Sequence, residues 1–287
     1  MPSLNMPVPP SFDRLLTRLD LEAGEPTSAR PGQIWIGHAG QRSATQGSRI
    51  FGGLVCAQVI VAAGRHPQAT AAGRQIHSVQ QVFLRPGQVG TPLIHQVETL
   101  FEGRTYASLR VTVWQNDEII SHAQIGLSSA DGGLRHMTPS PSVVRREDTV
   151  NRDELRGHEN WNDQPITTLV TEESYHSLDA ELASWMKAAG PVPDDPVMQR
   201  ALMGYASDRT MMSVARKPHT DKGTVISVTL NHSIWFHDEI DMSQWHSYTL
   251  NSPMGAHGRA MIHGAFHRED GHHAATTAQE GVIRLAR

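Results

Sequence analysis

The hydrophobic and polar positions along the chain follow two spacings, helical and alternating, and the order of these spacings occurs twice. Apolar residues at helical spacing predict a short amphipathic helix over residues 11–21, and runs of small and aliphatic side chains predict helices over 54–63 and 196–215. Alternating runs bounded by turn residues predict strands. These strands span residues 32–36, 75–84, 92–101, 105–115 and 119–128 in the first half, and 166–173, 224–236, 244–251, 259–267 and 273–286 in the second.

One segment of the chain is present in two related copies. Residues 53–65 read GLVCAQVIVAAGR and residues 204–216 read GYASDRTMMSVAR, so both copies are thirteen residues long. Further pairs follow in the same order: Val82-Phe83-Leu84 matches Ile234-Trp235-Phe236, and the run 122–127 matches the run 277–282. The sequence therefore predicts a duplicated fold.

One central helix followed by several antiparallel strands, repeated once, predicts an α+β fold in which each half wraps an antiparallel sheet around a helix. We place the first unit at residues 11–130 and the second at residues 166–287. Residues 131–165 are polar, contain a Gly-Gly pair and three prolines and lack a sustained period, which indicates a linker. The two units are expected to pair as a pseudo-dimer with a continuous sheet, and further association into a homo-oligomer is expected.

Composition excludes several classes of function. The net charge of −4 with mixed signs provides no basic field, so nucleic acid is not an expected partner. Cys56 is the single cysteine, which excludes an internal disulfide, and its apolar helical context indicates a buried structural thiol. No apolar run is long enough for a membrane helix, and the first residues lack a signal-peptide pattern. We expect a cytoplasmic protein without a membrane span.

The duplication draws attention to Asp208, because the matching position in the first copy is Ala57. A carboxylate on the sheet-facing side of a central helix costs several kcal/mol to desolvate unless it has partners. Thr229 and Gln279, both on predicted strands, could meet it. An ordinary interpretation is also open, in which Asp208 pairs with a surface arginine such as Arg209 and Thr229 is a β-branched strand residue. The first-half counterparts are Ala57, His77 and Gln124, so one of the three side chains is retained.

Several motifs together resemble the type II acyl-CoA thioesterases. The resemblance covers about residues 12–286 in order and implies a double hotdog fold, with hydrolysis of acyl-CoA to a free fatty acid and CoA. The motifs that carry it are Phe51-Gly-Gly53, Phe83-Leu-Arg-Pro-Gly87, Gly204-Tyr-Ala-Ser-Asp208, Asn231-His-Ser-Ile-Trp-Phe-His237 and Ala278-Gln-Glu-Gly-Val-Ile-Arg284.

The resemblance also implies site residues. In that family an Asp, a Thr or Ser and a Gln orient and activate a water, and the matching positions are Asp208, Thr229 and Gln279. A carboxylate can accept the proton of the water while the amide and hydroxyl fix its position, and this chemistry needs neither a cofactor nor a metal. The developing oxyanion needs a donor, for which a backbone N–H near a helix start or the Gln279 amide is expected.

The chain departs from the family pattern at Asn231, where the family usually has Asp, so a charge is lost two residues after Thr229. Asn keeps the size and hydrogen-bonding reach of Asp, which limits the expected effect. The phosphates of CoA also require cations. Four arginines are candidates for the substrate entrance, namely Arg49, Arg85, Arg104 and Arg259, although a solvated surface role suits each of them.

The histidines invite a metal hypothesis, which the spacing does not favour. His267, Asp270, His272 and His273 crowd one predicted hairpin, but they fit no standard ligand pattern, and the Asp-Gly turn predicts that they lie in solvent. His232 and His237 flank the aromatic pair and are expected to pack or to bond to backbone. A second centre at His77 is not expected, because no carboxylate accompanies it.

Other functions can be compared with the same residues. No Gly-x-Ser-x-Gly elbow supports a serine hydrolase, and Gly52-Gly53 lacks the Lys-Ser/Thr pair of a phosphate loop. Hotdog enoyl-CoA hydratases place a His five residues after their Asp, where this chain has Ser213. A non-catalytic acyl-CoA binding or regulatory protein stays open because of Asn231, whereas the intact set of Asp208, Thr229 and Gln279 argues for an enzyme acting on acyl-CoA.

Overall fold

The computed structural model describes residues 8–40, 49–70, 73–129, 133–138, 144–157 and 159–286. The first half contains α1 (Pro10–Leu19), β1 (Glu22–Gly24), β2 (Gln33–Gly37), α2 (Gly52–Gly64), α3 (Pro67–Thr70), β3 (Gln75–Phe83), β4 (Leu93–Glu102), β5 (Tyr106–Gln115) and β6 (Glu118–Ser128). The second contains η1 (Arg146–Asp148), β7 (Val150–Asn151), α4 (Arg152–Leu155), β8 (Ile166–Val170), α5 (Glu172–His176), β9 (Glu181–Ala188), α6 (Pro196–Ser207), α7 (Met211–Arg216), η2 (Lys217–Lys222), β10 (Val225–Phe236), β11 (His246–Ala256), β12 (Arg259–Arg268) and β13 (His273–Leu285).

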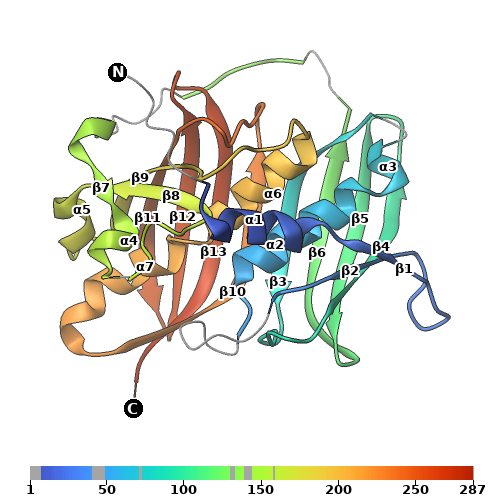
Figure 1. Cartoon of the computed structure of the whole chain (residues 1–287), viewed down its shortest axis with the longest axis horizontal. Helices are drawn as coiled ribbons and strands as arrows, with labels where there is room; N and C mark the ends of the chain where they lie inside the picture. The colour runs from blue at the N-terminus through green and yellow to red at the C-terminus, as the bar shows by residue number, and fades with distance from the viewer. Residues whose placement is uncertain are drawn as a thin grey trace.

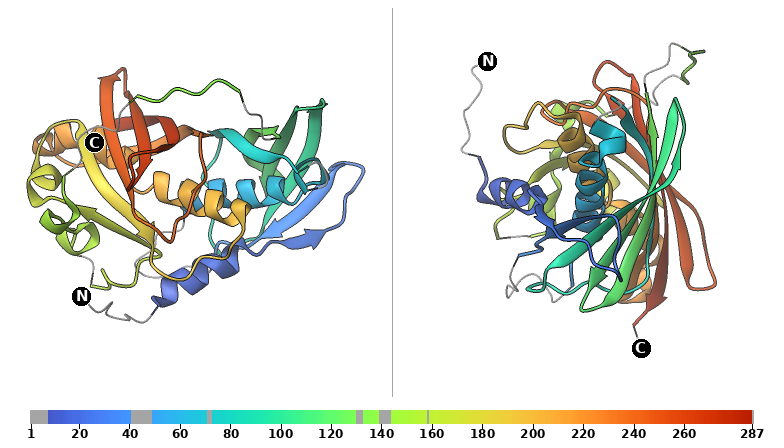
Figure 2. Two further views of the ribbon diagram at one scale, coloured as in Figure 1. Left: turned by 90° about the horizontal axis from the view of Figure 1, so that it is seen from above. Right: turned by 90° about the vertical axis from the view of Figure 1, so that its right-hand side faces the viewer.

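The strands form one 13-stranded antiparallel sheet in the order β1-β2-β4-β5-β6-β3-β10-β13-β12-β11-β9-β8-β7. The two halves meet where β3 pairs with β10, from Asn231 opposite Val82 to Trp235 opposite Ser78. The sheet curves around the helices, which lie together on its concave side (Figures 1 and 2). This arrangement confirms the predicted α+β double hotdog and its continuous sheet.

The two central helices, α2 and α6, occupy the space inside the sheet (Figure 1). Every residue of α2 from Gly53 to Gly64 is buried, which explains why its sequence is apolar on all sides. Close approach of the helices requires glycine: a Cβ at Gly64 would lie 2.4 Å from Val197 of α6, and one at Gly204 would lie 2.8 Å from Ile60 of α2. Cys56 of α2 is buried, as predicted.

The structure differs from the sequence-based elements in several places, and besides the short elements β1, α3 and α5 three differences affect the architecture. The predicted helix over 196–215 is two helices, α6 and α7, separated by residues 208–210. Strand β9 was not predicted, although its exposure alternates residue by residue. The linker 131–165 contains η1, β7 and α4, and β7 extends the sheet by pairing with β8. The unit boundaries 11–130, 131–165 and 166–287 stay a prediction. Of the helices in the described part of the chain, none combines the length and apolar character that a bilayer crossing requires.

Candidate active site

Asp208 lies at the break between α6 and α7, where it is the C-cap residue of α6. Its carboxylate reaches the start of the other central helix, where it accepts a hydrogen bond from the backbone N–H of Gly53. The approach to α2 is so close that a Cβ at Gly52 would lie 2.9 Å from Asp208 Oδ2. The site is therefore built between the two units of the fold, from the end of α6 and the beginning of α2.

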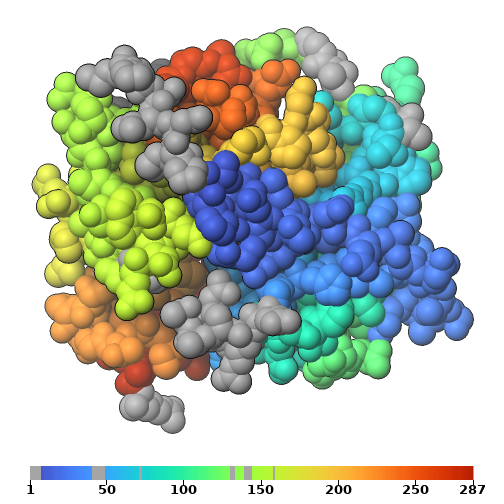
Figure 3. Space-filling model, in the orientation of Figure 1, coloured from blue at the N-terminus to red at the C-terminus, as the bar shows by residue number. Residues whose placement is uncertain are grey.

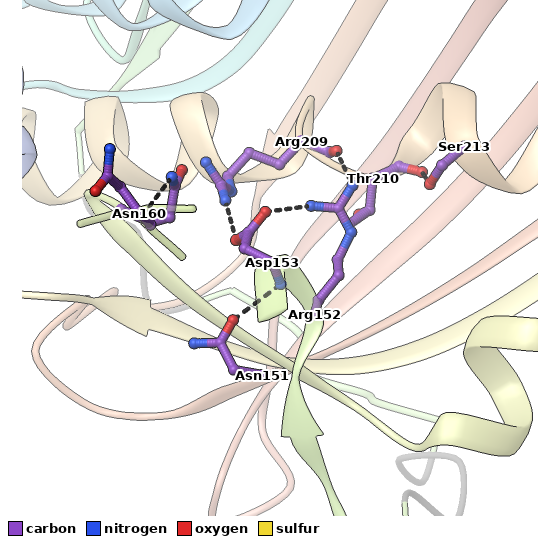
Figure 4. A network of polar contacts seen from close by, with 8 residues as sticks. Asn151, Arg152, Asp153, Asn160, Arg209, Thr210 and Ser213 are labelled. Carbon is purple, nitrogen blue, oxygen red and sulfur yellow. Dashed lines mark hydrogen bonds and ion pairs between the residues drawn. The ribbon is translucent and has the colours of Figure 1, made fainter. Parts of the chain in front are cut away.

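Three backbone carbonyl groups at the break between α6 and α7 accept hydrogen bonds from side chains. Tyr248 donates its hydroxyl to Ser207 O at 3.3 Å, and Arg152 donates Nη2 to Arg209 O at 3.3 Å. The Ser213 hydroxyl donates to Thr210 O (Figure 4). Unpaired carbonyls at a helix end cost free energy, so these three bonds stabilise the interruption that presents Asp208.

Thr229 and Gln279 lie beside Asp208, so the structure brings together all three residues that the sequence singles out. Gln279 is fully buried on β13, and its Nε2 donates to Asp208 Oδ1 at 3.1 Å and to Thr229 Oγ1 at 2.6 Å. Thr229 is on β10, the strand paired with β13. The Gln279 amide is thus the bridge between the carboxylate and the hydroxyl.

A β-bulge in β10 explains how Thr229 comes to face the helix. The ladder pairs His232 with Gln279 and Thr229 with Gly281, and the register shifts between Thr229 and Asn231. Side chains of a regular strand alternate between faces, so residues three apart would lie on opposite faces. The extra residue of the bulge restores Thr229 to the face of His232. Asn231 stabilises this irregular point, because its Oδ1 accepts a hydrogen bond from Glu280 N at 3.1 Å.

His232 fixes the orientation of the Gln279 amide. Its Nδ1 lies 3.2 Å from Gln279 Oε1, and its Nε2 lies 2.9 Å from Ser207 Oγ. Burial lowers the pKa of His232 to about 4, so the ring is neutral at neutral pH. Because Oε1 can only accept, we assign the proton to Nδ1, which leaves Nε2 as an acceptor facing Ser207. The single hydroxyl proton of Ser207 is then shared between His232 Nε2 and Gly204 O, each 2.9 Å from Oγ. The Gln279 amide nitrogen must then point at Asp208 and Thr229.

This result corrects the sequence-based interpretation of His232, which expected packing or backbone bonding. The ring bonds instead to two side chains of the site. Ser207 was also missed, although it immediately precedes Asp208 in the matched motif and has no counterpart hydroxyl at Cys56 of the first copy. The difference between Ser207 and Cys56 is the sequence signal that could have identified Ser207 as a residue of the site.

The electrostatics of Asp208 combine opposing effects. Burial is the largest and raises the pKa to about 7, while the hydrogen bonds from the Gln279 side chain and the Gly53 N–H oppose it. The positive end of the α2 dipole lies at the same point and also favours the carboxylate form. Asp208 keeps part of its surface open to solvent. The carboxylate therefore changes its protonation state near neutral pH and remains reachable by water.

The first-half counterparts do not form a similar group in the described chain. Ala57 is fully buried, and Gln124 donates to Ser108 Oγ at 3.2 Å on the exposed side. His77 packs edge to face against Tyr106 with ring centroids 6.1 Å apart. The carboxylate, hydroxyl and amide are therefore together in the second half only.

The predicted solvent position of the hairpin histidines is wrong for His267. This residue is 3% exposed and stacks on His273 with centroids 4.6 Å apart. The β12–β13 register shifts between Phe266 and His267, which places both consecutive residues in buried positions. His272 lies near exposed Asp270, as predicted. His237 approaches Thr276 Oγ1 at 2.8 Å. Among the described residues, no group of three His, Cys, Asp or Glu is placed to hold a metal ion.

Two of the four candidate arginines of the substrate entrance are already paired. Arg85 forms an ion pair with Glu118, and Arg259 forms one with Glu280. Arg104 supplies a carbonyl to Arg74. Arg49 is exposed and lies two residues before Phe51, the N-cap of α2, so it is the candidate nearest in sequence to the site.

Comparisons with known proteins identify the family of the chain. A family model described as acyl-CoA thioesterase matches residues 169–282, and one described as the acyl-CoA thioesterase N-terminal domain matches residues 40–127. The chain is 32% identical to acyl-CoA thioesterase 2 of Haemophilus influenzae over 257 residues, which cover 83% of this chain and 88% of that protein. It is 28% identical to acyl-coenzyme A thioesterase 8 of Mus musculus, with coverage of 83% and 81%.

Solved structures give the same result. The tesB protein of Mycobacterium avium subspecies paratuberculosis superimposes with a TM-score of 0.78 at 28% identity, covering 96% of this chain and 99% of that one. The acyl-CoA thioesterase II of Mycobacterium marinum has a TM-score of 0.78 at 25% identity, with coverage of 95% and 98%. The chain therefore belongs to the type II acyl-CoA thioesterase family and is an acyl-CoA thioester hydrolase with a double hotdog fold.

Proposed function

We propose that the chain hydrolyses fatty acyl-CoA to a free fatty acid and CoA by activating a water between Asp208, Thr229 and Gln279. The observation that carries this proposal is the bridging amide of Gln279, which contacts Asp208 Oδ1 and Thr229 Oγ1 at once. Both protons of that amide are engaged, so the hydroxyl proton of Thr229 is free to bind the oxygen of a water. The carboxylate of Asp208 is then the acceptor for a proton of the same water.

The steps of the reaction balance without a covalent enzyme intermediate. The water oxygen forms a bond to the thioester carbonyl carbon while Asp208 takes one proton. Collapse of the tetrahedral intermediate breaks the carbon–sulfur bond, and the thiolate of CoA leaves and receives the proton from Asp208. A pKa of about 7 suits a group that must accept and then release a proton near neutral pH.

The oxyanion donor in this proposal is backbone rather than the Gln279 amide. Both N–H bonds of Gln279 point to Asp208 and Thr229, so neither remains for the substrate. The first turn of α2, which starts at Gly52 beside the carboxylate, supplies the N–H of Gly52 and the positive end of a helix dipole. The next three N–H groups are engaged, by Asp208 at Gly53 and by the Phe51 carbonyl at Leu54 and Val55. A thioester carbonyl oxygen placed against this turn would be stabilised as its charge develops.

The test is thiol release from a series of acyl-CoA lengths by the wild type and by Asp208→Asn. Asn keeps the shape of the side chain and removes the proton acceptor, so kcat should fall about 10²- to 10⁴-fold. Glu280→Gln is the matched control, because it removes a carboxylate adjacent to Gln279 that pairs with Arg259 outside the site, and its activity should stay near wild type. Full turnover by Asp208→Asn would refute the assignment. Assembly as a homo-oligomer and a cytoplasmic location stay predictions.

A further inference from the structure

A second polar site lies between α4, α5 and α7, the helix that follows Asp208 in the chain. It is a pocket of about 300 Å³, and its charged lining consists of Arg152, Arg156, His176, Arg216 and Lys217. None of the described residues that line it is an aspartate or a glutamate. The lining of this pocket is therefore positively charged, although the net charge of the chain is −4.

Among the described residues, three cations of the pocket form no ion pair, namely Arg156, Arg216 and Lys217, whereas Arg152 pairs with Asp153. The charges of Asp179 and Glu181 partly oppose the lowering of the Lys217 pKa by burial. Arg216 donates only weakly to Ser227 Oγ, at 3.4 Å, and Lys217 donates Nζ to two backbone carbonyls, Ser174 O and Glu181 O, at 2.6 and 2.7 Å. Arg156, the C-cap residue of α4, is exposed and forms no ion pair with any described residue. Arg152 does contact Asp153, at 3.3 Å, but Arg209 shares that carboxylate at 2.7 Å.

These guanidinium groups are close enough to repel one another. The pKa of Arg216 is lowered by burial and then by the charge of Arg156. The pKa of Arg152 is lowered to about 10, mainly by burial; the charge of Asp153 opposes this lowering, and those of Arg156 and Arg209 add to it. A fold that gathers like charges in a pocket gains free energy when an anion enters, and guanidinium groups match the geometry of phosphate oxygens.

The pocket is joined to the catalytic residue through a short piece of chain. Arg152 and Ser213, which line it, bond to the carbonyls of Arg209 and Thr210, the two residues that follow Asp208 (Figure 4). Arg216 is the last residue of α7, the helix that begins three residues after Asp208. In Figure 3 the yellow-green surface of the residues around α4 lies beside the orange surface of the residues around η2.

We propose that this pocket binds a phosphate group of the CoA substrate and so sets the preference for CoA thioesters over thioesters without phosphates. The proposal rests on the proposed function of Asp208, because the phosphates must be held while the thioester reaches that residue. The pantetheine arm of CoA separates its phosphates from its sulfur, which suits a phosphate site displaced from the carboxylate along α7. The chemistry recognised is a phosphate ester, which a free nucleotide could also supply.

The test compares Arg156→Gln and Arg216→Gln with wild type on acyl-CoA and on the matching acyl-pantetheine, which has no phosphate. Loss of one charged hydrogen-bond donor should raise KM for acyl-CoA roughly tenfold, with kcat little changed and with acyl-pantetheine unaffected. Arg110→Gln is the control, since Arg110 pairs with Glu98 on the first-half strands, and it should leave both substrates unchanged. An unchanged KM for acyl-CoA, or equal increases for both substrates, would overturn the proposal.

Two further experiments distinguish failure of the phosphate-site proposal from failure of the proposed role of Asp208. Adenosine 3′,5′-bisphosphate, the nucleotide fragment of CoA, should inhibit competitively, and Arg156→Gln should weaken that inhibition; non-competitive inhibition would overturn the substrate assignment. Calorimetric binding of the same nucleotide does not require turnover, so it tests the pocket even if Asp208 is not catalytic. Arg156 is exposed, so its variant is expected to fold even if the substitution of the partly buried Arg216 prevents folding.

Discussion

Substitution of Asp208 by Asn should lower activity and raise stability at the same time. Burial raises the pKa of the folded carboxyl to about 7 from an ordinary value of 3.8. Between these two values the folded state retains a proton that the unfolded state has lost, so wild-type stability falls as the pH rises through this window. Asn has no proton to lose. The variant should therefore match wild type near pH 4 and exceed it above pH 7.

The size of the effect follows from the shift in pKa. A difference of about 3 units at about 1.4 kcal/mol each gives a ceiling of about 4 kcal/mol above pH 7. Asp208 keeps some contact with solvent, which screens the cost, so we expect about 2 kcal/mol. For a chain of this length that corresponds to a rise in Tm of roughly 5 °C.

The assay is thermal unfolding of wild type, Asp208→Asn and Glu280→Gln from pH 4.5 to pH 8, together with thiol release at each pH. The gap in Tm between Asp208→Asn and wild type should open as the pH rises, while the Glu280→Gln control should show no such opening. A gap that is constant with pH, or a variant that is less stable than wild type at pH 8, would refute the argument that a desolvated carboxylate is kept at a cost in stability.

Three further outcomes follow from the same geometry. Wild-type kcat/KM should rise with pH through about 7, because Asp208 acts as a carboxylate, and a flat profile across that range would contradict this role. Gly52→Ala places a Cβ 2.9 Å from Asp208 Oδ2, so kcat should fall about tenfold while the variant still folds. Gly133→Ala is the control, because its Cβ would meet nothing within 4 Å, and its kcat should equal that of wild type. Ser207→Ala removes the hydroxyl that contacts His232 Nε2, and steady-state thiol release should show kcat about tenfold lower with KM unchanged. An effect on KM alone would argue against the inference that His232 orients the Gln279 amide.

The sequence by itself determined the outline of the fold and the identity of the central groups. The repeated segment at 53–65 and 204–216 already predicted a duplicated α+β fold, because duplicated units keep their hydrophobic spacing. The contrast between Ala57 and Asp208 identified the half with the carboxylate. The motifs around Thr229 and Gln279 then linked both residues to Asp208, and the structure places all three in hydrogen-bonding contact.

Only the tertiary structure decided how these side chains meet. The break after α6 depends on Tyr248 and Arg152, which come from elsewhere in the chain, and the bulge after Thr229 depends on pairing with β13. The role of His232 likewise requires its partners in three dimensions. Spacing along a sequence records local periodicity, whereas a strand's register and the partner of a buried polar group are set by residues distant in the chain, so periodicity alone cannot specify them.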